Sequence, residues 1–243
     1  MTAPFADLVK EFAPTGNLRA AINSANPVLV QIDPATDAPG GVTMELAREL
    51  ARRLGVPLAP IVIDGAGKSF EAVKAASCDV GFLAIEPARA AEIDFTNAYV
   101  IIEGVYAVRA DTALQKNEEV DRAGVRIAVN KGAAYDLFLT RSLKAATLVR
   151  TEEATEVFAR DNLEVLAGVK QGVVRFAQGN PGVRLLPGRF MEIRQAMCLP
   201  KGRPAAAKYL GAFVEEMKAS GMVADALKRS NQPDAAVAPP AGQ

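Results

Sequence analysis

The chain has 243 residues, of which half are hydrophobic and 23% are charged, a composition typical of a folded globular protein. Its 28 basic side chains equal its 28 acidic ones, so it lacks the basic excess that nucleic-acid binding usually leaves. No run of about 18 apolar residues occurs, so no membrane-spanning helix is expected. Histidine is absent, which removes the commonest general base and the commonest metal ligand. We therefore expect no metal site and no cofactor.

The first 15 residues carry Phe5, Leu8 and Phe12 at helical spacing, with charged residues between them. A secretory signal needs a basic start and then an apolar stretch, so this segment instead predicts a short amphipathic helix. Either a signal has been removed or the protein stays in the cytoplasm.

The two cysteines, Cys78 and Cys198, are far apart in the sequence. Two thiols are compatible with one disulfide or with none. Because an unpaired cysteine packs as a small hydrophobic side chain, we expect two buried free thiols.

Strand-like and helix-like segments alternate along the chain, which predicts an α/β fold with mostly parallel sheets flanked by helices. The first strand is expected over Leu18–Ile22. A helix follows with leucines at steps of four, with Thr43 as its N-cap and Gly55 at its end. Pro87 suits the first turn of another helix. Further strands are expected over Leu58–Ile63, Asp79–Ile85 and Tyr99–Arg109.

The alternation restarts after a polar stretch over residues 111–122. Gly132 is expected to open a helix directly after the strand Val125–Val129. Two helices broken at Gly221 are expected near the end, and the Pro- and Ala-rich tail from Gln232 is expected to be disordered. Further strands are expected over Thr147–Arg150, Leu163–Val169, Val183–Leu186 and Phe190–Leu199.

Two long β-type segments, near residues 99–109 and 190–199, join two βα blocks. Two crossovers predict that the chain enters a second lobe and returns to the first. Lobe 1 is expected to comprise residues 1–103 and 194–243, and lobe 2 residues 104–193. Ligands of such hinged proteins lie between the lobes.

The segment Glu86-Pro87-Ala88-Arg89 follows a buried strand and places Arg89 in the first turn of a helix. A helix start carries about half a positive charge, so a cation there is disfavoured unless an anion joins it. The planar guanidinium matches a carboxylate through two hydrogen bonds. The alternative is an ion pair between Arg89 and Glu86 or Glu92.

Two weaker signals lie at other strand ends. The segment Asn130-Lys131-Gly132-Ala133-Ala134-Tyr135 predicts a Gly-led helix start whose N–H groups can bind an anion, or simply a turn that needs Gly. Asn23 and Asn26 directly follow the first strand, where ligands of α/β sheets bind, although Asn also suits turns.

The run from Asp79 to Tyr99 resembles the signature of the bacterial extracellular solute-binding proteins of the polar amino-acid type, which serve ABC importers. Here Glu86-Pro87-Ala88-Arg89 matches the T-P-E-R type turn of that family, and Asp94-Phe95-Thr96 and Tyr99 follow it. The segment Gly41–Leu46 resembles the family's first helix start, and Lys131–Ala134 its Gly-Thr/Ser turn. The likeness extends over residues 16–230.

The resemblance implies the two-lobed periplasmic-binding-protein type II fold and a ligand carboxylate held by Arg89, helped by N–H groups of Ala133 and Ala134. It implies a wall in lobe 1 formed by Asn23, Asn26, Leu83, Ala84, Glu86 and Tyr99. It implies a wall in lobe 2 formed by Lys131, Gly132, Ala133, Ala134, Tyr135, Val169, Lys170 and Gln171.

The chain departs from the family at two places. The family often holds the ligand's amino group with an acid after the strand matching Leu163–Val169, where this chain continues with Lys170 and Gln171. The family's threonine is Glu86 here, and a serine is Ala84. Either Glu86 meets a cationic nitrogen, or the ligand has no amine and Lys131 or Lys170 meets a second carboxylate. We favour the second hypothesis because a buried unpaired ammonium is costly. In a third interpretation Glu86 only caps its helix and both lysines are solvated.

The resemblance therefore predicts a solute-binding protein that captures a small amino acid or organic acid for ABC-type uptake and is not an enzyme. Its expected partners are the solute and an ABC permease, without nucleic acid or membrane insertion, and its expected location is the periplasm or, alternatively, the cytoplasm. One alternative is a cyclohexadienyl-dehydratase-like enzyme that uses Glu86 as its acid. Another is a stand-alone sensor, although the chain leaves no room for the DNA-binding segment of LysR-type regulators.

Overall fold

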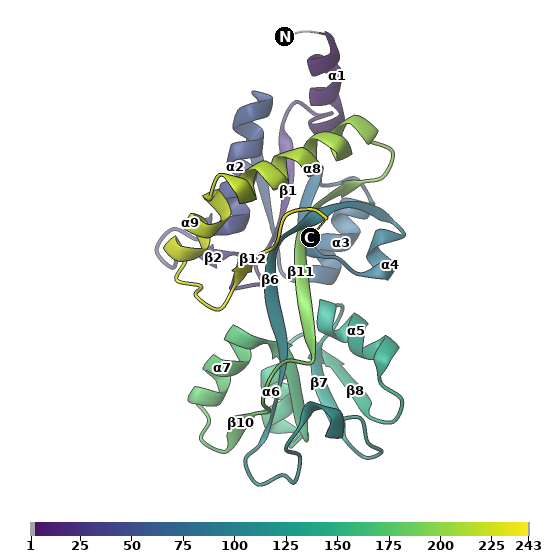
Figure 1. Ribbon diagram of the computed structural model, residues 1–243, viewed down its shortest axis with the longest axis vertical. Coiled ribbons are helices and arrows are strands. Elements are labelled where there is room, and N and C mark those ends of the chain that lie inside the picture. Colours follow the sequence, from purple (N-terminus) through teal and green to yellow (C-terminus); the bar gives the residue numbers. More distant parts are fainter. Residues whose placement is uncertain (1–2, 243) are drawn as a thin grey trace. The chain divides into compact units, whose positions relative to one another are not determined.

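The computed structural model describes residues 3–242 and divides them into two compact units (Figure 1). The first unit contains the described residues up to Ile101 and again from Arg194 onward, and the second contains Ile102–Ile193. Two strands pass from one unit to the other, β6 (Ile93–Arg109) and β11 (Met191–Pro200). The long β-type segments of the sequence are therefore the two connections.

Three neighbouring strands of the sheet are parallel in the first unit. β4 (Leu58–Ile63), β1 (Leu18–Asn23) and β5 (Val80–Ala84) are parallel neighbours in that order. β11 joins β5 antiparallel and has β6 as its other neighbour. Two short strands, β2 (Gln31–Ile32) and β3 (Pro39–Gly40), form a separate antiparallel pair. The predicted strands of this unit are confirmed, but β6 begins at Ile93 instead of Tyr99, and β2 and β3 were not predicted.

Helices α2 (Val42–Leu54) and α3 (Ala66–Lys74) both pack on β1 and β4. The leucines of α2 are buried, and Gly55 ends the helix with a left-handed φ of 68°, as predicted. The N-cap prediction was wrong. Gly41 precedes the helix, and Thr43 lies inside its first turn with 1% of its surface exposed.

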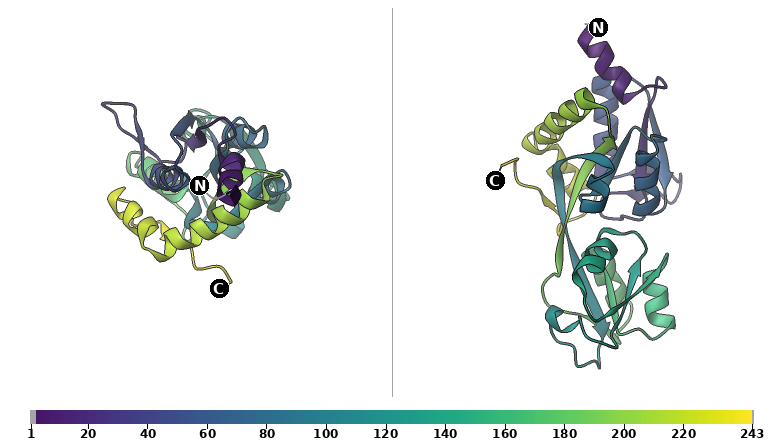
Figure 2. Two further views of the ribbon diagram at one scale, coloured as in Figure 1. Left: turned by 90° about the horizontal axis from the view of Figure 1, so that it is seen from above. Right: turned by 90° about the vertical axis from the view of Figure 1, so that its right-hand side faces the viewer.

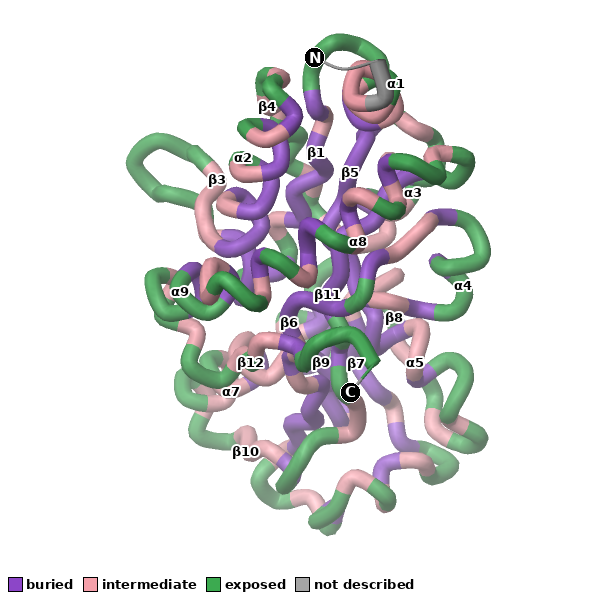
Figure 3. Tube along the Cα trace, turned by 45° about the horizontal axis from the view of Figure 1, so that its top comes forward, coloured by how far each residue is buried: buried purple, intermediate pink, exposed green. Residues whose placement is uncertain are grey.

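The core on the α3 side of the sheet contains Ala21, Val73, Leu83 and both cysteines. Side chains alternate along a strand, so the neighbours of Ala21 in β1 belong to the opposite, α2 side. Figure 3 shows that β5 is buried along its length and β1 along most of it, whereas the loop over residues 32–38 is exposed. Both thiols are free and buried, which confirms that prediction.

The amphipathic helix predicted at the start of the chain is α1 (Ala3–Phe12), and it packs against α8 (Pro204–Ala219) (Figure 2). The ring of Phe12 meets the ring of Tyr209 edge-on, with centroids 5.9 Å apart. Glu11 accepts the N–H of Ala206 at 2.8 Å, which satisfies a donor in the first turn of α8. α9 (Met222–Arg229) follows α8 after Gly221.

The prediction of a disordered tail from Gln232 was wrong. β12 (Ala236–Val237) pairs antiparallel with Val100 and Ile101 of β6. Lys218 donates to the carbonyl of Pro239 at 2.9 Å, and the N–H of Ala238 donates to Tyr99 at 3.0 Å. A low content of large apolar side chains predicted disorder, but backbone hydrogen bonds to an open strand edge hold the segment instead.

β4 is an edge strand of this sheet. Leu18 donates to Pro57 at 2.9 Å and Ser24 donates to Ile63 at 3.0 Å, so the odd-numbered residues of β4 point their backbone groups at β1. Pro60 therefore lies at an outward-pointing position. It has no N–H to offer there, which is how proteins protect a sheet edge whose side chains include the exposed Ile61 and Val62.

In the second unit the same ten-stranded sheet continues with three parallel strands. β9 (Val165–Val169), β7 (Arg126–Asn130) and β8 (Thr147–Thr151) are parallel neighbours. β6 is antiparallel to β9 on one side and to β10 (Val183–Leu185) on the other. A short 3-10 helix, η1 (Asn117–Glu119), lies in the polar stretch before β7. The strand predictions of this half of the chain are confirmed.

Three helices of the second unit surround this sheet. α6 (Ala154–Arg160) and α7 (Lys170–Gln178) cover a core that includes Phe158, Leu166 and Val173. α5 (Ala134–Ser142) belongs to a separate aromatic group, in which Phe138 and Tyr106 both contact Phe190, and Tyr106 stacks on it with centroids 4.2 Å apart. The helices follow from apolar side chains at helical spacing.

A buried carboxylate holds the first unit together at the start of β5. Asp79 has no exposed surface and accepts hydrogen bonds from Arg19 at 2.8 Å and from Arg203 at 3.1 Å. The side chain of Asp79 raises the pKa of Arg19 further. Because removal of one partner leaves the remaining buried charges unmatched, this cluster should be important for stability.

We expect Asp79→Ala to lower the free energy of unfolding by about 3–5 kcal/mol, the usual cost of breaking a buried ion pair. Urea denaturation followed by circular dichroism measures this change. Asp7→Ala is the matched control, because Asp7 pairs with Lys10 on the surface and both side chains are at least 75% exposed. Equal effects of the two substitutions would contradict the importance of the cluster.

Candidate functional site

Arg89 lies in the turn that follows β5. Glu86 is extended with a φ of −135°, Pro87 begins the short helix α4 (Pro87–Ala90), and Arg89 is its third residue. The N–H of Arg89 donates to Glu86 at 3.0 Å, and its side-chain Nη1 donates to the carbonyl of Ala84 at 3.1 Å. Only 2% of Arg89 is exposed. The guanidinium is therefore held at the end of a fully buried strand and not in bulk solvent.

Two opposing effects act on the charge of Arg89. Burial lowers the pKa of the guanidinium, and the negative charge of Glu86 opposes this by stabilising the cation. Glu86 itself is 3% exposed. Since an arginine does not lose its proton in proteins, the turn holds a cation that is shielded from water and has an acid beside it.

The same cation affects a neighbouring thiol. Burial raises the pKa of Cys198 to about 12, and the charge of Arg89 opposes this increase. Cys198 packs with Cys78 and Leu83 in the core cluster on the α3 side. The Arg89 turn is therefore adjacent to the hydrophobic core of the first unit.

The two asparagines after β1 form local turns. Asn23 Oδ1 accepts the N–H of Ala25 at 3.2 Å, and Asn26 Oδ1 accepts the N–H of Val28 at 3.2 Å. Both residues are buried, at 8% and 9% exposure. The structure thus gives their oxygens the turn-forming role that the sequence left open as the alternative to ligand contact.

Two other residues predicted to line the wall of the first unit lie in its core. Leu83 has 1% of its surface exposed and packs in the cluster with the cysteines. Tyr99 has no exposed surface, and its ring meets that of Phe82 edge-on with centroids 6.4 Å apart. Burial raises the pKa of the Tyr99 hydroxyl. Their positions are those of packing residues.

The Gly132 turn of the second unit is held by a carboxylate of the same unit. Gly132 has a φ of 71°, a conformation that favours glycine, and its N–H donates to Asp136 Oδ2 at 2.9 Å. The next N–H, of Ala133, donates to the carbonyl of Asn130 at 3.1 Å. Arg150 donates to Asp136 Oδ1 at 2.9 Å and fixes the acid from β8. The Ala133 N–H that the resemblance assigns to the ligand therefore closes a turn in this structure.

The remaining residues of this segment differ in exposure. Lys131 is exposed, and its backbone N–H donates to Thr151 at 2.8 Å. Ala134 and Tyr135 are 7% and 8% exposed at the start of α5. Burial raises the pKa of the Tyr135 hydroxyl. Lys131 thus lies at the surface, and Tyr135 is an almost fully buried phenol.

Lys170 begins α7 and pairs with an acid that the sequence did not indicate. Its Nζ donates to Glu103 Oε2 at 2.8 Å, and Arg189 Nη1 donates to Glu103 Oε1 at 3.0 Å. Lys170 and, after it, Arg189 hold the pKa of Glu103 below its usual value. Lys170 was one of two candidates for a second ligand carboxylate, and in the structure a carboxylate of the chain already meets it.

Gln171 follows Lys170 in the first turn of α7. Its amide nitrogen and its amide oxygen are both shielded from solvent, and neither makes a hydrogen bond within the part of the chain that the structure describes. Most buried polar atoms in proteins have a hydrogen-bond partner, so an amide with two unsatisfied atoms is unusual.

Sequence reasoning missed Glu103, Asp136 and Arg150. Asp136 left a local signal, because it lies four residues after Gly132 and within the first turn of the following helix. Glu103 left none, since it is 67 residues away from Lys170 in the sequence.

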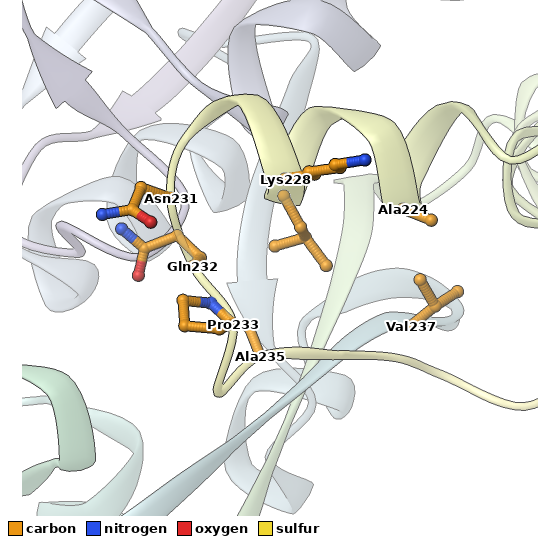
Figure 4. A pocket seen from close by; sticks show the side chains of 8 residues that line it. Ala224, Lys228, Asn231, Gln232, Pro233, Ala235 and Val237 are labelled. Carbon is orange, nitrogen blue, oxygen red and sulfur yellow. The ribbon is translucent and has the colours of Figure 1, made fainter.

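Each unit also has an open cavity away from these residues. The one in Figure 4 measures about 290 Å³ and lies between α9 and the segment that leads to β12. One in the second unit measures about 240 Å³ and is lined by residues such as Phe158 and Pro181. Neither is lined by a predicted site residue. Within residues 3–242 no group of three or more acids and cysteines is arranged to hold a metal ion.

In the described part of the chain, no helix combines the length and the apolar character needed to cross a membrane. No curated protein matches the chain. The comparison with solved structures, in contrast, gives the fold.

The structure is similar to that of the solute receptor for L-cysteine of Neisseria gonorrhoeae, with a TM-score of 0.79, 20% identity, and coverage of 93% of this chain and 94% of that one. A mutant of ArgBP from T. maritima has a TM-score of 0.77 and 20% identity, with 92% and 99% covered. An ancestral amino acid-binding protein, a precursor of cyclohexadienyl dehydratase, has a TM-score of 0.74 and 18% identity, with 91% and 98% covered. The fold is that of the solute-binding proteins, and the predicted fold class is confirmed.

Residues 18–231 match the bacterial extracellular solute-binding proteins, family 3. The chain belongs to this family. Its main activity is therefore solute binding, as the sequence predicted.

We expect the stabilising effect of Glu103 to depend on pH. Its folded pKa is lowered, so its contribution is present above the unfolded pKa of about 4.3 and is lost as the pH falls through the folded value. Urea unfolding of the wild type and of Glu103→Gln between pH 7 and pH 3 should give a stability difference that shrinks toward the acidic end. Glu118→Gln, at an exposed position, is the control. A constant difference for Glu103→Gln would contradict the pairing.

Proposed function

We propose that this protein captures a small carboxylate-bearing solute and that Arg89 binds the carboxylate. The observation that carries this proposal is the burial of the Arg89 guanidinium, 2% exposed, at the end of β5. It lies in the segment whose sequence resembles the family signature. A charge-assisted hydrogen bond is strongest where water is excluded, so a carboxylate that reaches this guanidinium is bound tightly.

The second unit is proposed to contribute the segment 131–135 and the start of α7. Asp136 and Arg150 support this by fixing the Gly132 turn, since a contact surface must be rigid before the ligand arrives to bind it well. The two compact units are proposed as the two lobes. Closure of the lobes on the ligand stays a prediction from the sequence.

An ABC permease is the proposed partner, and the periplasm is the proposed location. Both proposals follow from membership in a family of extracellular solute-binding proteins. Several structures with this fold carry names of amino-acid binders, such as the L-cysteine receptor. We propose an organic or amino acid of similar size for this chain, to be identified by a thermal-shift screen of amino acids, dicarboxylates and aromatic acids.

A second candidate function is a dehydratase reaction on a cyclic acid. It is favoured by one observation, the buried carboxyl group of Glu86 beside the cation Arg89, which together can hold an acidic substrate and place an acid–base group next to it. We propose binding without catalysis, because the family is one of solute-binding proteins.

We expect the purified protein to leave prephenate and arogenate unchanged over several hours, as followed by the absorbance and chromatography of the aromatic products. The same assay on Glu86→Gln controls for contaminating enzymes. Turnover by the wild type that Glu86→Gln abolishes would replace the binding proposal with the enzymatic one.

We expect Arg89→Ala to abolish binding of the solute found in the screen, because removal of one partner of a buried charge pair costs at least about 2 kcal/mol, or roughly thirtyfold in affinity. Isothermal titration calorimetry measures the affinity. Arg89→Lys should also weaken binding, since it keeps the charge and loses the planar fork.

Arg160→Ala is the matched control, because Arg160 is exposed and pairs with its neighbour Asp161. Circular dichroism must show that each variant is folded. Unchanged affinity of a folded Arg89→Ala or Arg89→Lys variant would refute the anchor role.

A further inference from the structure

Among the described residues of the second unit, two side-chain amides have buried atoms without a hydrogen bond, those of Gln171 and Asn117. Asn117 still donates through Nδ2 to the carbonyl of Pro187 at 3.2 Å, whereas in Gln171 both amide atoms are unsatisfied. Gln171 lies directly after β9, at the end of a strand where ligands of α/β proteins bind. A buried donor and a buried acceptor without partners cost free energy, so a partner from outside the chain would be bound favourably.

Two acids that contact predicted site residues of the second unit are already matched by cations of the same unit. Glu103 is held by Lys170 at 2.8 Å and by Arg189 at 3.0 Å. Asp136 is held by Arg150 at 2.9 Å and also accepts the N–H of Gly132. An ammonium group would have to displace one of these cations to gain a carboxylate partner here, which makes its binding unfavourable.

The chemistry of the amide selects the kind of group that it can bind. It offers one donor nitrogen and one acceptor oxygen. An ammonium group only donates, so it would satisfy the oxygen and leave the nitrogen facing another donor. A hydroxyl group both donates and accepts, so a single hydroxyl can satisfy both atoms.

We propose that Gln171 is the specificity-determining residue of the second unit and that it binds a ligand hydroxyl. The ligand class is then a 2-hydroxy carboxylate in preference to the corresponding 2-amino acid. This inference rests on the proposed function, in which Arg89 binds the carboxylate of the same ligand. It also replaces the hypothesis of a second carboxylate at Lys170, because Glu103 meets that lysine.

Calorimetry with matched pairs tests this inference. The pairs are L-lactate with L-alanine, L-malate with L-aspartate, and L-phenyllactate with L-phenylalanine. For the pair that fits best, we expect the wild type to bind the hydroxy acid about tenfold or more tightly than the amino acid. The hydroxyl satisfies both atoms of the Gln171 amide, whereas the ammonium group leaves its nitrogen without an acceptor.

Gln171→Met keeps the length of the side chain and removes both polar atoms. We expect it to lose about tenfold in affinity for the hydroxy acid, while the melting temperature of the ligand-free protein stays the same or rises. Gln171→Glu should move the preference toward the amino acid, because a carboxylate suits an ammonium group. Gln178→Met, at an exposed position of the same helix, is the matched control and should change neither affinity.

The outcomes separate this inference from the proposed function. Tighter binding of the amino acids by the wild type, or an unchanged affinity in Gln171→Met, overturns the role of Gln171. If Arg89→Lys still loses binding in that case, the proposed function stands. If no member of any pair binds, or if neither Arg89→Lys nor Gln171→Met alters binding, both are overturned.

Discussion

The first unit depends on one constraint, which is that a positive charge placed inside a protein must be matched. Arg89 is buried at the end of β5, and the surrounding turn meets this demand with the carbonyl of Ala84 and the charge of Glu86. Asp79, at the other end of the same strand, is matched in the same way by two arginines. A fully apolar strand is thus bounded at both ends by compensated charges, and this fixes where it begins and ends. A ligand carboxylate at Arg89 would join a set of charges that is already close to neutral.

Patterns that act over a few residues could be predicted from the sequence. The β strands, the helix of leucines that ends at Gly55, and the turn with Pro87 before Arg89 follow from apolar periodicity and from the preferences of Gly and Pro. The N-cap at Thr43 failed because Thr43 is buried against the sheet, where packing overrides capping preference. The prediction of a disordered tail was wrong because the tail is ordered by its pairing with β6, which is distant in the sequence.

The same distinction between local patterns and long-range contacts applies to the candidate site. The sequence indicated Arg89, Lys170 and Gln171 through their places at strand ends, but it could not give their partners. Glu103 meets Lys170 across 67 residues, a pairing that only the three-dimensional fold creates. The resemblance places Leu83 and Tyr99 on a wall of the site, and in the structure both side chains pack in the core of the first unit, a contact that the sequence alone does not give. Local chemistry therefore indicated candidate residues, and long-range packing determined the partners that these residues have in the fold.

The proline in the edge strand has a consequence for how this protein behaves at high concentration. Pro60 removes a hydrogen-bond donor from the outer side of β4, where Ile61 and Val62 would otherwise invite another chain to add a strand. The exposed apolar side chains of β4 therefore do not make this edge prone to aggregation. The sheet ends at β4 because Pro60 offers no backbone N–H to an added strand.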